Sequence, residues 1–150
     1  MKGFTLIEIL VSLAILAVIS VIGLNSFSSV NTDKALDLEA EKVISLIAKA
    51  RALTLSAKDG AAYGVHFEER TAVLFRGPTY SSGALANQVQ AFNDIVKLSA
   101  AALAGGGVEV LFAKLTGATA QSGTITLAAV RDASKTRVIT IAATGVASGN

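Results

Sequence analysis

Cysteine and tryptophan are absent from this chain of 150 residues, and histidine and proline occur once each, as His66 and Pro78. Without cysteine the fold has no disulfide and is held by packing alone. A zinc site would lack both cysteine and a second histidine, and a Ser-His-Asp arrangement would have to use His66. We therefore expect no enzyme, no catalytic residue, no cofactor and no metal.

The chain also has little excess of charge of either sign, because it contains 13 basic and 11 acidic residues and its formal charge is +2. No basic tract is typical of a nucleic-acid footprint, and residues 145–150 carry no charged side chain. Arg131, Lys135 and Arg137 form only a thin basic cluster. A few phosphate contacts would bind weakly and be lost in salt, so nucleic acid is not an expected partner.

One long apolar run is present, over residues 4–24. As a helix these residues rise about 30 Å, which is roughly the hydrocarbon thickness of a bilayer. The run is longer than the core of a secretory signal and lacks the small-residue cleavage site that should follow one. The sequence predicts a membrane-spanning helix, and a plain N-terminal anchor is the alternative. Glu8 lies near its start, although a central acidic residue costs roughly 2.5–3.5 kcal/mol there.

The segment Gly3-Phe4-Thr5-Leu6-Ile7-Glu8 resembles the processing site of type IV pilins and type II secretion pseudopilins. The resemblance implies that a prepilin peptidase cuts between Gly3 and Phe4, that Phe4 is then N-methylated, and that Glu8 guides assembly. The leader would be residues 1–3, which is short for the family. Either Lys2 supplies enough cytoplasmic positive charge, or the start codon lies upstream.

The physical interpretation of Glu8 agrees with this resemblance. After cleavage, Phe4 has a free amino group one helical turn from Glu8. In an assembled bundle, the Glu8 carboxylate of one subunit could meet the Phe4 ammonium of its neighbour. Two desolvated charges would then become one satisfied pair, and removing one partner of such a pair costs about 3–5 kcal/mol. The alternative is that Glu8 extends to the lipid headgroups and has no role.

The apolar periodicity of residues 33–58 is helical. The predicted buried stripe consists of Leu36, Ala40, Val43, Ile47, Ala50 and Leu53. Residues 58–60 are a plausible stop, with Gly60 able to adopt a positive φ. Residues 25–32 are weak helix formers and predict a soft spot or kink. We divide the chain into the leader, a transmembrane and assembly helix at residues 4–30, and a head at residues 31–150.

After residue 60 the apolar pattern changes to alternation, which predicts strands. The expected strands cover residues 62–67, 72–76, 95–98, 108–112, 124–130 and 137–142. The first two and the last two form hairpins. Residues 84–94 fit either a short helix or an ordered loop, and the fold is expected to end at residues 145–146, before a tail of small residues. The order predicts an α+β fold, in which a long N-terminal helix, half membrane-spanning and half amphipathic, packs on one antiparallel sheet of four to six strands.

This order also resembles the H-type minor pseudopilins and related minor pilins, through residues 48–52, 63–67 and 137–141 and Gly145. The resemblance implies a structural subunit that is a single-pass protein of the inner (cytoplasmic) membrane and then joins an extracellular or periplasmic filament. Its expected partners are further copies of itself, the prepilin peptidase and methyltransferase, and the assembly platform of the inner membrane. A type IV pilus-like subunit is the main hypothesis. A minor pseudopilin of type II secretion and a minor pilin that binds DNA for uptake are the alternatives.

Overall fold

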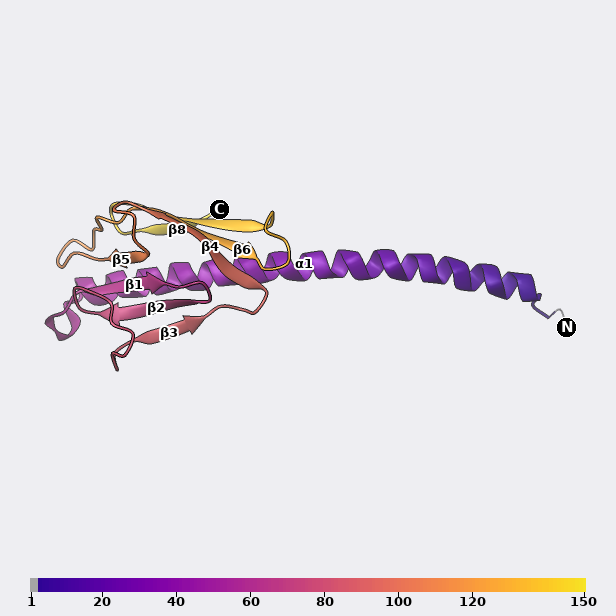
Figure 1. Cartoon of the computed structure of the whole chain (residues 1–150), viewed down its shortest axis with the longest axis horizontal. Helices are drawn as coiled ribbons and strands as arrows, with labels where there is room; N and C mark the ends of the chain where they lie inside the picture. The colour runs from indigo at the N-terminus through magenta and orange to yellow at the C-terminus, as the bar shows by residue number, and fades with distance from the viewer. Residues whose placement is uncertain (1–2) are drawn as a thin grey trace. The chain divides into compact units, whose positions relative to one another are not determined.

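The computed structural model describes residues 3–150, with the side chains of residues 21–29 left out. The chain forms two compact units, Met1–Lys34 and Ala35–Asn150, and we call the second unit the head. One helix, α1 (Leu6–Leu55), has residues in both units (Figure 1). It is followed by a short 3-10 turn, η1 (Lys58–Gly60). The strands of the described chain are β1 (Tyr63–Phe67), β2 (Thr71–Arg76), β3 (Gln88–Ala91), β4 (Val96–Leu103), β5 (Glu109–Leu111), β6 (Gly123–Ala129), β7 (Thr136–Ile141) and β8 (Ala147–Gly149).

Helix α1 buries the predicted stripe. Leu36, Val43 and Ile47 are fully buried in the head, whereas Leu53 is only partly buried. Residues 25–32 are helical, and a kink there stays a prediction. The helix ends at Leu55 rather than at residue 58, because Ala57 is left-handed and its N–H bonds the Thr54 carbonyl at 3.1 Å, which tightens the last turn.

The strands form two antiparallel sheets rather than the single sheet that we expected. Sheet 1 has the order β3-β2-β1-β5 and sheet 2 the order β4-β6-β7-β8. Both predicted hairpins are confirmed, with Tyr63 opposite Arg76 in the first and Leu127 opposite Arg137 in the second. The expectation of one sheet was wrong because β4 pairs with β6 and β5 with β1, and these pairings between distant strands leave no periodic signal in the sequence.

Three strand predictions need correction. Strand β3 lies in the stretch that we assigned to a short helix or a loop, β4 continues five residues beyond the predicted residues 95–98, and β8 lies in the supposed tail. The side chains of β3 are mostly exposed and β8 consists of small residues, so neither shows core-facing alternation. Backbone pairing to β2 and β7 defines these strands instead.

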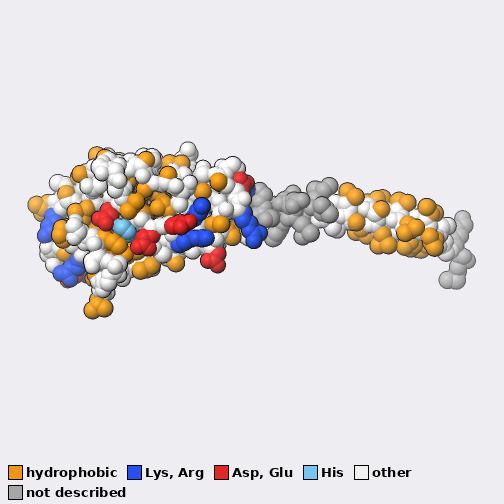
Figure 2. Space-filling view, viewed as in Figure 1, with side chains coloured by type: hydrophobic (Ala, Val, Ile, Leu, Met, Phe, Trp, Pro, Cys, Tyr) orange, Lys and Arg blue, Asp and Glu red, His pale blue; other side chains and the backbone are white. Residues whose placement is uncertain are grey.

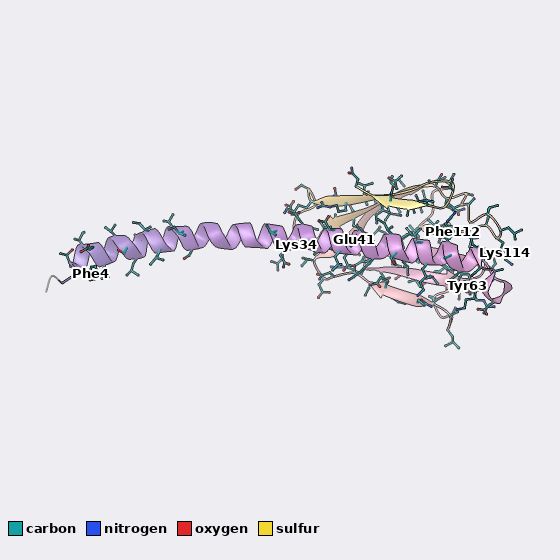
Figure 3. All side chains as sticks on the ribbon, turned by 180° about the vertical axis from the view of Figure 1, so that it is seen from behind. Phe4, Lys34, Glu41, Tyr63, Phe112 and Lys114 are labelled. Atoms are coloured by element: carbon teal, nitrogen blue, oxygen red, sulfur yellow. The ribbon has the colours of Figure 1, made fainter. Side chains whose placement is uncertain are left out.

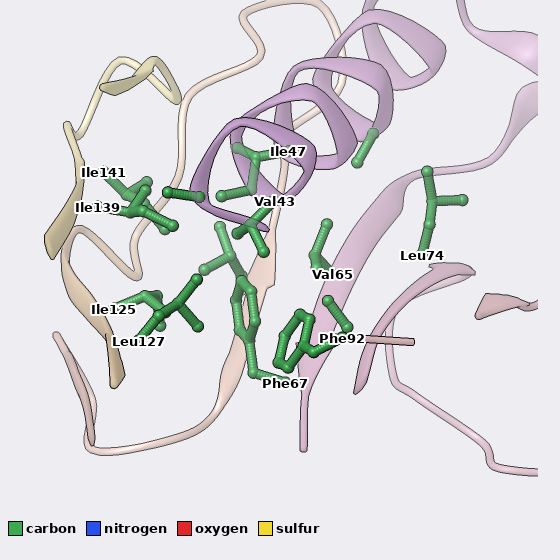
Figure 4. Close-up of a cluster of buried hydrophobic side chains, with 14 of the residues drawn as sticks. Val43, Ile47, Val65, Phe67, Leu74, Phe92, Ile125, Leu127, Ile139 and Ile141 are labelled. Atoms are coloured by element: carbon green, nitrogen blue, oxygen red, sulfur yellow. The ribbon is translucent and has the colours of Figure 1, made fainter. Parts of the chain in front are cut away.

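The core of the head lies between α1 and both sheets (Figure 4). Val43 and Ile47 of α1 face Val65 of sheet 1 and Ile139 of sheet 2. Burying one such aliphatic side chain contributes about 1.5–3 kcal/mol. The predicted alternation of β1 is confirmed, because Tyr63, Val65 and Phe67 are buried in the core and His66 is directed away from it.

Candidate functional site

The described side chains from Phe4 to Ile19 form a continuous apolar surface. The large ones have exposed fractions between 50% and 81%: Phe4, Leu6, Ile7, Ile9, Leu10, Val11, Leu13, Ile15, Leu16, Val18 and Ile19 (Figures 2 and 3). Contiguous exposed apolar surface of this kind marks an interaction with protein or membrane.

Among the residues whose side chains are described, no helical stretch is both long enough and apolar enough to be assigned as a membrane span. The predicted span of residues 4–24 runs into residues 21–29, whose side chains lie outside the described part. The span therefore stays a prediction.

Glu8 lies in the first turn of α1 and forms a reciprocal cap with Thr5. The Thr5 N–H donates to Glu8 Oε2 and the Glu8 N–H donates to Thr5 Oγ1, both at 3.4 Å. This capping box satisfies two N–H groups that the start of a helix leaves unpaired. Our sequence interpretation missed the role of Thr5. A threonine three residues before a glutamate, at the start of an apolar run, is the sequence signature of a capping box.

The proposed cleavage site precedes the helix. Gly3 and Phe4 are exposed and lie outside any helix or strand, before α1 begins. No atom lies within 4 Å of the position that a side chain at Gly3 would take. The structure therefore places an accessible peptide bond next to the first turn, which holds Glu8.

His66 lies half-buried on the outer face of sheet 1. Its Nδ1 is 3.0 Å from Glu109 Oε1 and its Nε2 is 3.8 Å from Glu68 Oε1. Because both ring nitrogens face carboxylates, neither faces a hydroxyl as a Ser-His arrangement requires. No group of three or more His, Cys, Asp or Glu side chains in the described chain could hold a metal ion.

The thin basic cluster is partly compensated by acidic side chains. Arg137 forms an ion pair with Asp37 of α1, and Arg131 is followed directly by Asp132. Hydrogen bonds from the hydroxyl and the backbone N–H of Ser134 hold the pKa of Asp132 below its usual value, so this carboxylate stays charged. The resulting surface is of mixed charge rather than a basic patch.

Two further charged side chains were missed by our sequence interpretation. Glu39 is only 1% exposed, and its Oε1 accepts a bond of 2.9 Å from Lys42 Nζ, whereas its Oε2 has no partner among the described residues. Arg51 Nε donates to the carbonyls of Gly117 and Thr144 at 3.1 and 3.2 Å. It thereby ties two loops of the head to the end of α1.

Comparison with known proteins agrees with this arrangement. Residues 1–24 match the prokaryotic N-terminal methylation motif. The fold is similar to that in the crystal structure of the type IV minor pilin FimU of Pseudomonas aeruginosa strain PAO1, with a TM-score of 0.57 and 14% identity over 77% of this chain and 92% of that one. The chain carries a prepilin methylation motif on a type IV pilin-like fold.

The predicted resemblance to pilins and the predicted α+β fold are thus confirmed. No curated protein matches the chain by sequence. The methylation motif covers the bond between Gly3 and Phe4, where cleavage stays a prediction, and it covers Glu8, whereas the likeness to FimU is one of fold.

Proposed function

We propose that this pilin-like protein is a structural subunit of a type IV pilus-like filament. The observation that carries the proposal is the continuous exposed apolar surface from Phe4 to Ile19, which starts within the methylation motif. A subunit that waits in a membrane and then joins a bundle of helices needs such a surface. Lipid is already apolar, so the gain on leaving it comes from packing and from satisfied charges.

Processing comes first in this proposal. A prepilin peptidase cuts the exposed bond between Gly3 and Phe4, and Phe4 is methylated. Residues 4–30 hold the subunit in the inner membrane until the assembly platform delivers it to the filament. Residues 31–150, which include the head, then form the outer part of the filament and determine what the filament contacts.

Glu8 is the residue that we assign to assembly. Its bonds to Thr5 are long, at 3.4 Å, and a carboxylate has capacity for further hydrogen bonds. The ammonium group of Phe4 in a neighbouring copy would supply a charge-assisted bond of about 2.7–2.9 Å. This pair exists only after the leader is removed and a second copy arrives, so it couples processing to assembly.

Mass spectrometry of the mature N-terminus tests the processing step. Protein isolated from cells with an active prepilin peptidase should begin with methylated Phe4. The same cells without the peptidase supply the control, in which residues 1–3 are retained. Functional filaments whose subunits retain Met1 would contradict the proposal.

Replacement of the carboxylate tests assembly. We predict that Glu8→Ala leaves the subunit processed and membrane-bound but absent from sheared filaments, because the neighbour's Phe4 ammonium loses its partner at a cost of about 3–5 kcal/mol. Glu41→Ala, which removes an exposed glutamate from the head part of α1, is the matched control and should assemble. Normal incorporation of Glu8→Ala would eliminate the assigned role.

The type II secretion pseudopilin is the main alternative, and it uses the same chemistry. The similarity to a minor pilin favours a pilus. A secretion defect without surface filaments on deletion would favour the pseudopilin. DNA uptake has less support because Arg137 is paired with Asp37. Salt-sensitive DNA retention that is lost in the double variant Arg131→Ala and Arg137→Ala would favour it.

A further inference from the structure

The outer face of sheet 1 carries apolar side chains that lie outside the main core. Val73 and Phe75 of β2 are 2% and 1% exposed, yet neither belongs to the core cluster between α1 and the sheets. Tyr80 packs edge-on against Phe75, with 5.8 Å between ring centroids. Tyr80 belongs to residues 77–87, which connect β2 to β3 and which we call the β2–β3 loop. This loop therefore covers part of the outer face.

Four residues hold the middle of this loop on the sheet, and we call them the loop clamp: His66, Glu68, Tyr80 and Glu109. The His66 ring stacks on Tyr80 at 3.9 Å with an interplanar angle of 10°. Glu109 of β5 and Glu68 of the β1–β2 turn face the two ring nitrogens, and the Tyr80 hydroxyl donates to Glu68 Oε1 at 3.3 Å. The pale blue histidine lies between acidic side chains on the visible face (Figure 2).

The rest of the loop is bonded mainly to itself. Ser81 accepts hydrogen bonds from the Ala84 N–H and from Asn87 Nδ2, and the Asn87 N–H donates to Ala84. Leu85 is fully exposed at the tip. Among residues 80–87, Tyr80 makes all of the described hydrogen bonds and ring contacts to sheet 1 and its β1–β2 turn. Whatever loosens the clamp therefore frees the loop.

We propose that the loop clamp depends on a proton, so that protonated His66 holds the β2–β3 loop on sheet 1 and neutral His66 releases it. An imidazolium carries an N–H on both ring nitrogens, and here it would form ion pairs with two carboxylates from different elements, Glu109 at 3.0 Å and Glu68 at 3.8 Å. A neutral imidazole donates from one nitrogen only, which leaves a lone pair facing a negative charge. Histidine changes charge between about pH 5 and pH 8.

The other titratable groups that face His66 are the carboxyl groups of Glu68 and Glu109 and the hydroxyl of Tyr80. Tyr80 stays neutral because burial, followed by the negative charge of Glu68, raises the pKa of its hydroxyl. The loop is therefore closed at the acidic end of the window. Opening at the alkaline end uncovers the ring of Phe75 on the outer face of sheet 1.

Amide hydrogen exchange of the full chain in detergent micelles tests the proposal. The reporters are the N–H groups of Ala84 and Asn87, with rates corrected for the intrinsic effect of pH on exchange. We expect about tenfold greater protection near pH 5.5 than near pH 7.5, because charge-assisted hydrogen bonds are roughly twice as strong as neutral ones. Equal protection at the two pH values would overturn the proposal.

Four variants separate the clamp from a general effect of pH. His66→Gln keeps a polar side chain that does not titrate, and because the chain has no other histidine, the response should disappear. Glu109→Gln should reduce the response, whereas Glu69→Gln, the matched control outside the clamp, should retain it. Should His66→Gln fail to fold, Glu109→Gln and Glu68→Gln carry the test. An undiminished response in His66→Gln, or in both of these glutamate variants, would refute the clamp.

Discussion

At the residue scale, Gly64 is the position that the packing of sheet 1 leaves least free. A Cβ added there would lie 2.5 Å from the Phe75 ring and 2.7 Å from the Val110 carbonyl oxygen, closer than real contacts allow. Gly64 thus leaves room for the Phe75 ring beside β1. Its backbone conformation is ordinary, so the constraint is one of space and not of φ.

We predict that Gly64→Ala lowers the free energy of unfolding of the head by about 1–3 kcal/mol, as overpacking does in other cores. Urea denaturation measures the change. Gly107→Ala is the matched control, because its added Cβ would have its nearest neighbour, the Glu109 nitrogen, at 3.9 Å; we expect a change of about 0.5 kcal/mol or less. Equal losses in the two variants would contradict the steric explanation.

At the element scale, the turn between β6 and β7 depends on a charged side chain. Asp132 Oδ1 accepts from the Ser134 hydroxyl at 2.6 Å and from the Ser134 N–H at 3.1 Å, and these bonds lower the pKa of Asp132. A carboxyl whose pKa is lower in the folded state stabilises the fold above its unfolded pKa, near 3.9. That contribution is lost as the pH falls through the folded pKa.

We predict that Ser134→Ala raises the pKa of Asp132 toward its usual value. The variant removes the hydrogen bond from the Ser134 hydroxyl, which is the largest cause of the lowered pKa. A carboxyl-resolved NMR titration of the full chain between about pH 2 and pH 6 measures the change. Ser82→Ala, in the β2–β3 loop, is the control and should leave the Asp132 titration as it is. An unshifted Asp132 in Ser134→Ala would show that the serine hydroxyl does not hold the charge.

At the scale of the whole molecule, the two compact units have different kinds of surface. Every member of the hydrophobic core lies between Leu36 and Ile141, inside the head. The large side chains described between Phe4 and Ile19 are exposed instead. One unit thus contains its own core, and the other presents apolar surface for an environment that the chain does not itself provide.

We predict that residues 31–150 fold without the N-terminal segment. Because the head contains the whole core cluster, the shortened chain should unfold in one cooperative transition and keep dispersed side-chain NMR signals. The full chain in micelles is the reference. Loss of the side-chain signals with retention of helical circular dichroism would indicate a molten state and would show that the head needs residues 1–30.

The sequence by itself determined the features that depend on neighbouring residues. The segment from Gly3 to Glu8, the apolar run over residues 4–24 and the helical stripe from Leu36 to Ala50 are recognised from spacing within each segment. The two hairpins follow from alternation on either side of a short turn. In each case the residues that show the sequence pattern are the same residues that form the helix or the hairpin.

Only the tertiary structure decided how the strands divide between two sheets and which side chains meet on them. His66 contacts Glu109, 43 positions away, and Arg51 reaches Thr144 across 93. Such contacts depend on which strand edges pair once the chain has collapsed around α1, and local propensity carries no information about that choice. The same reason hid β3 and β8, which exist because β2 and β7 leave an edge for them to pair with.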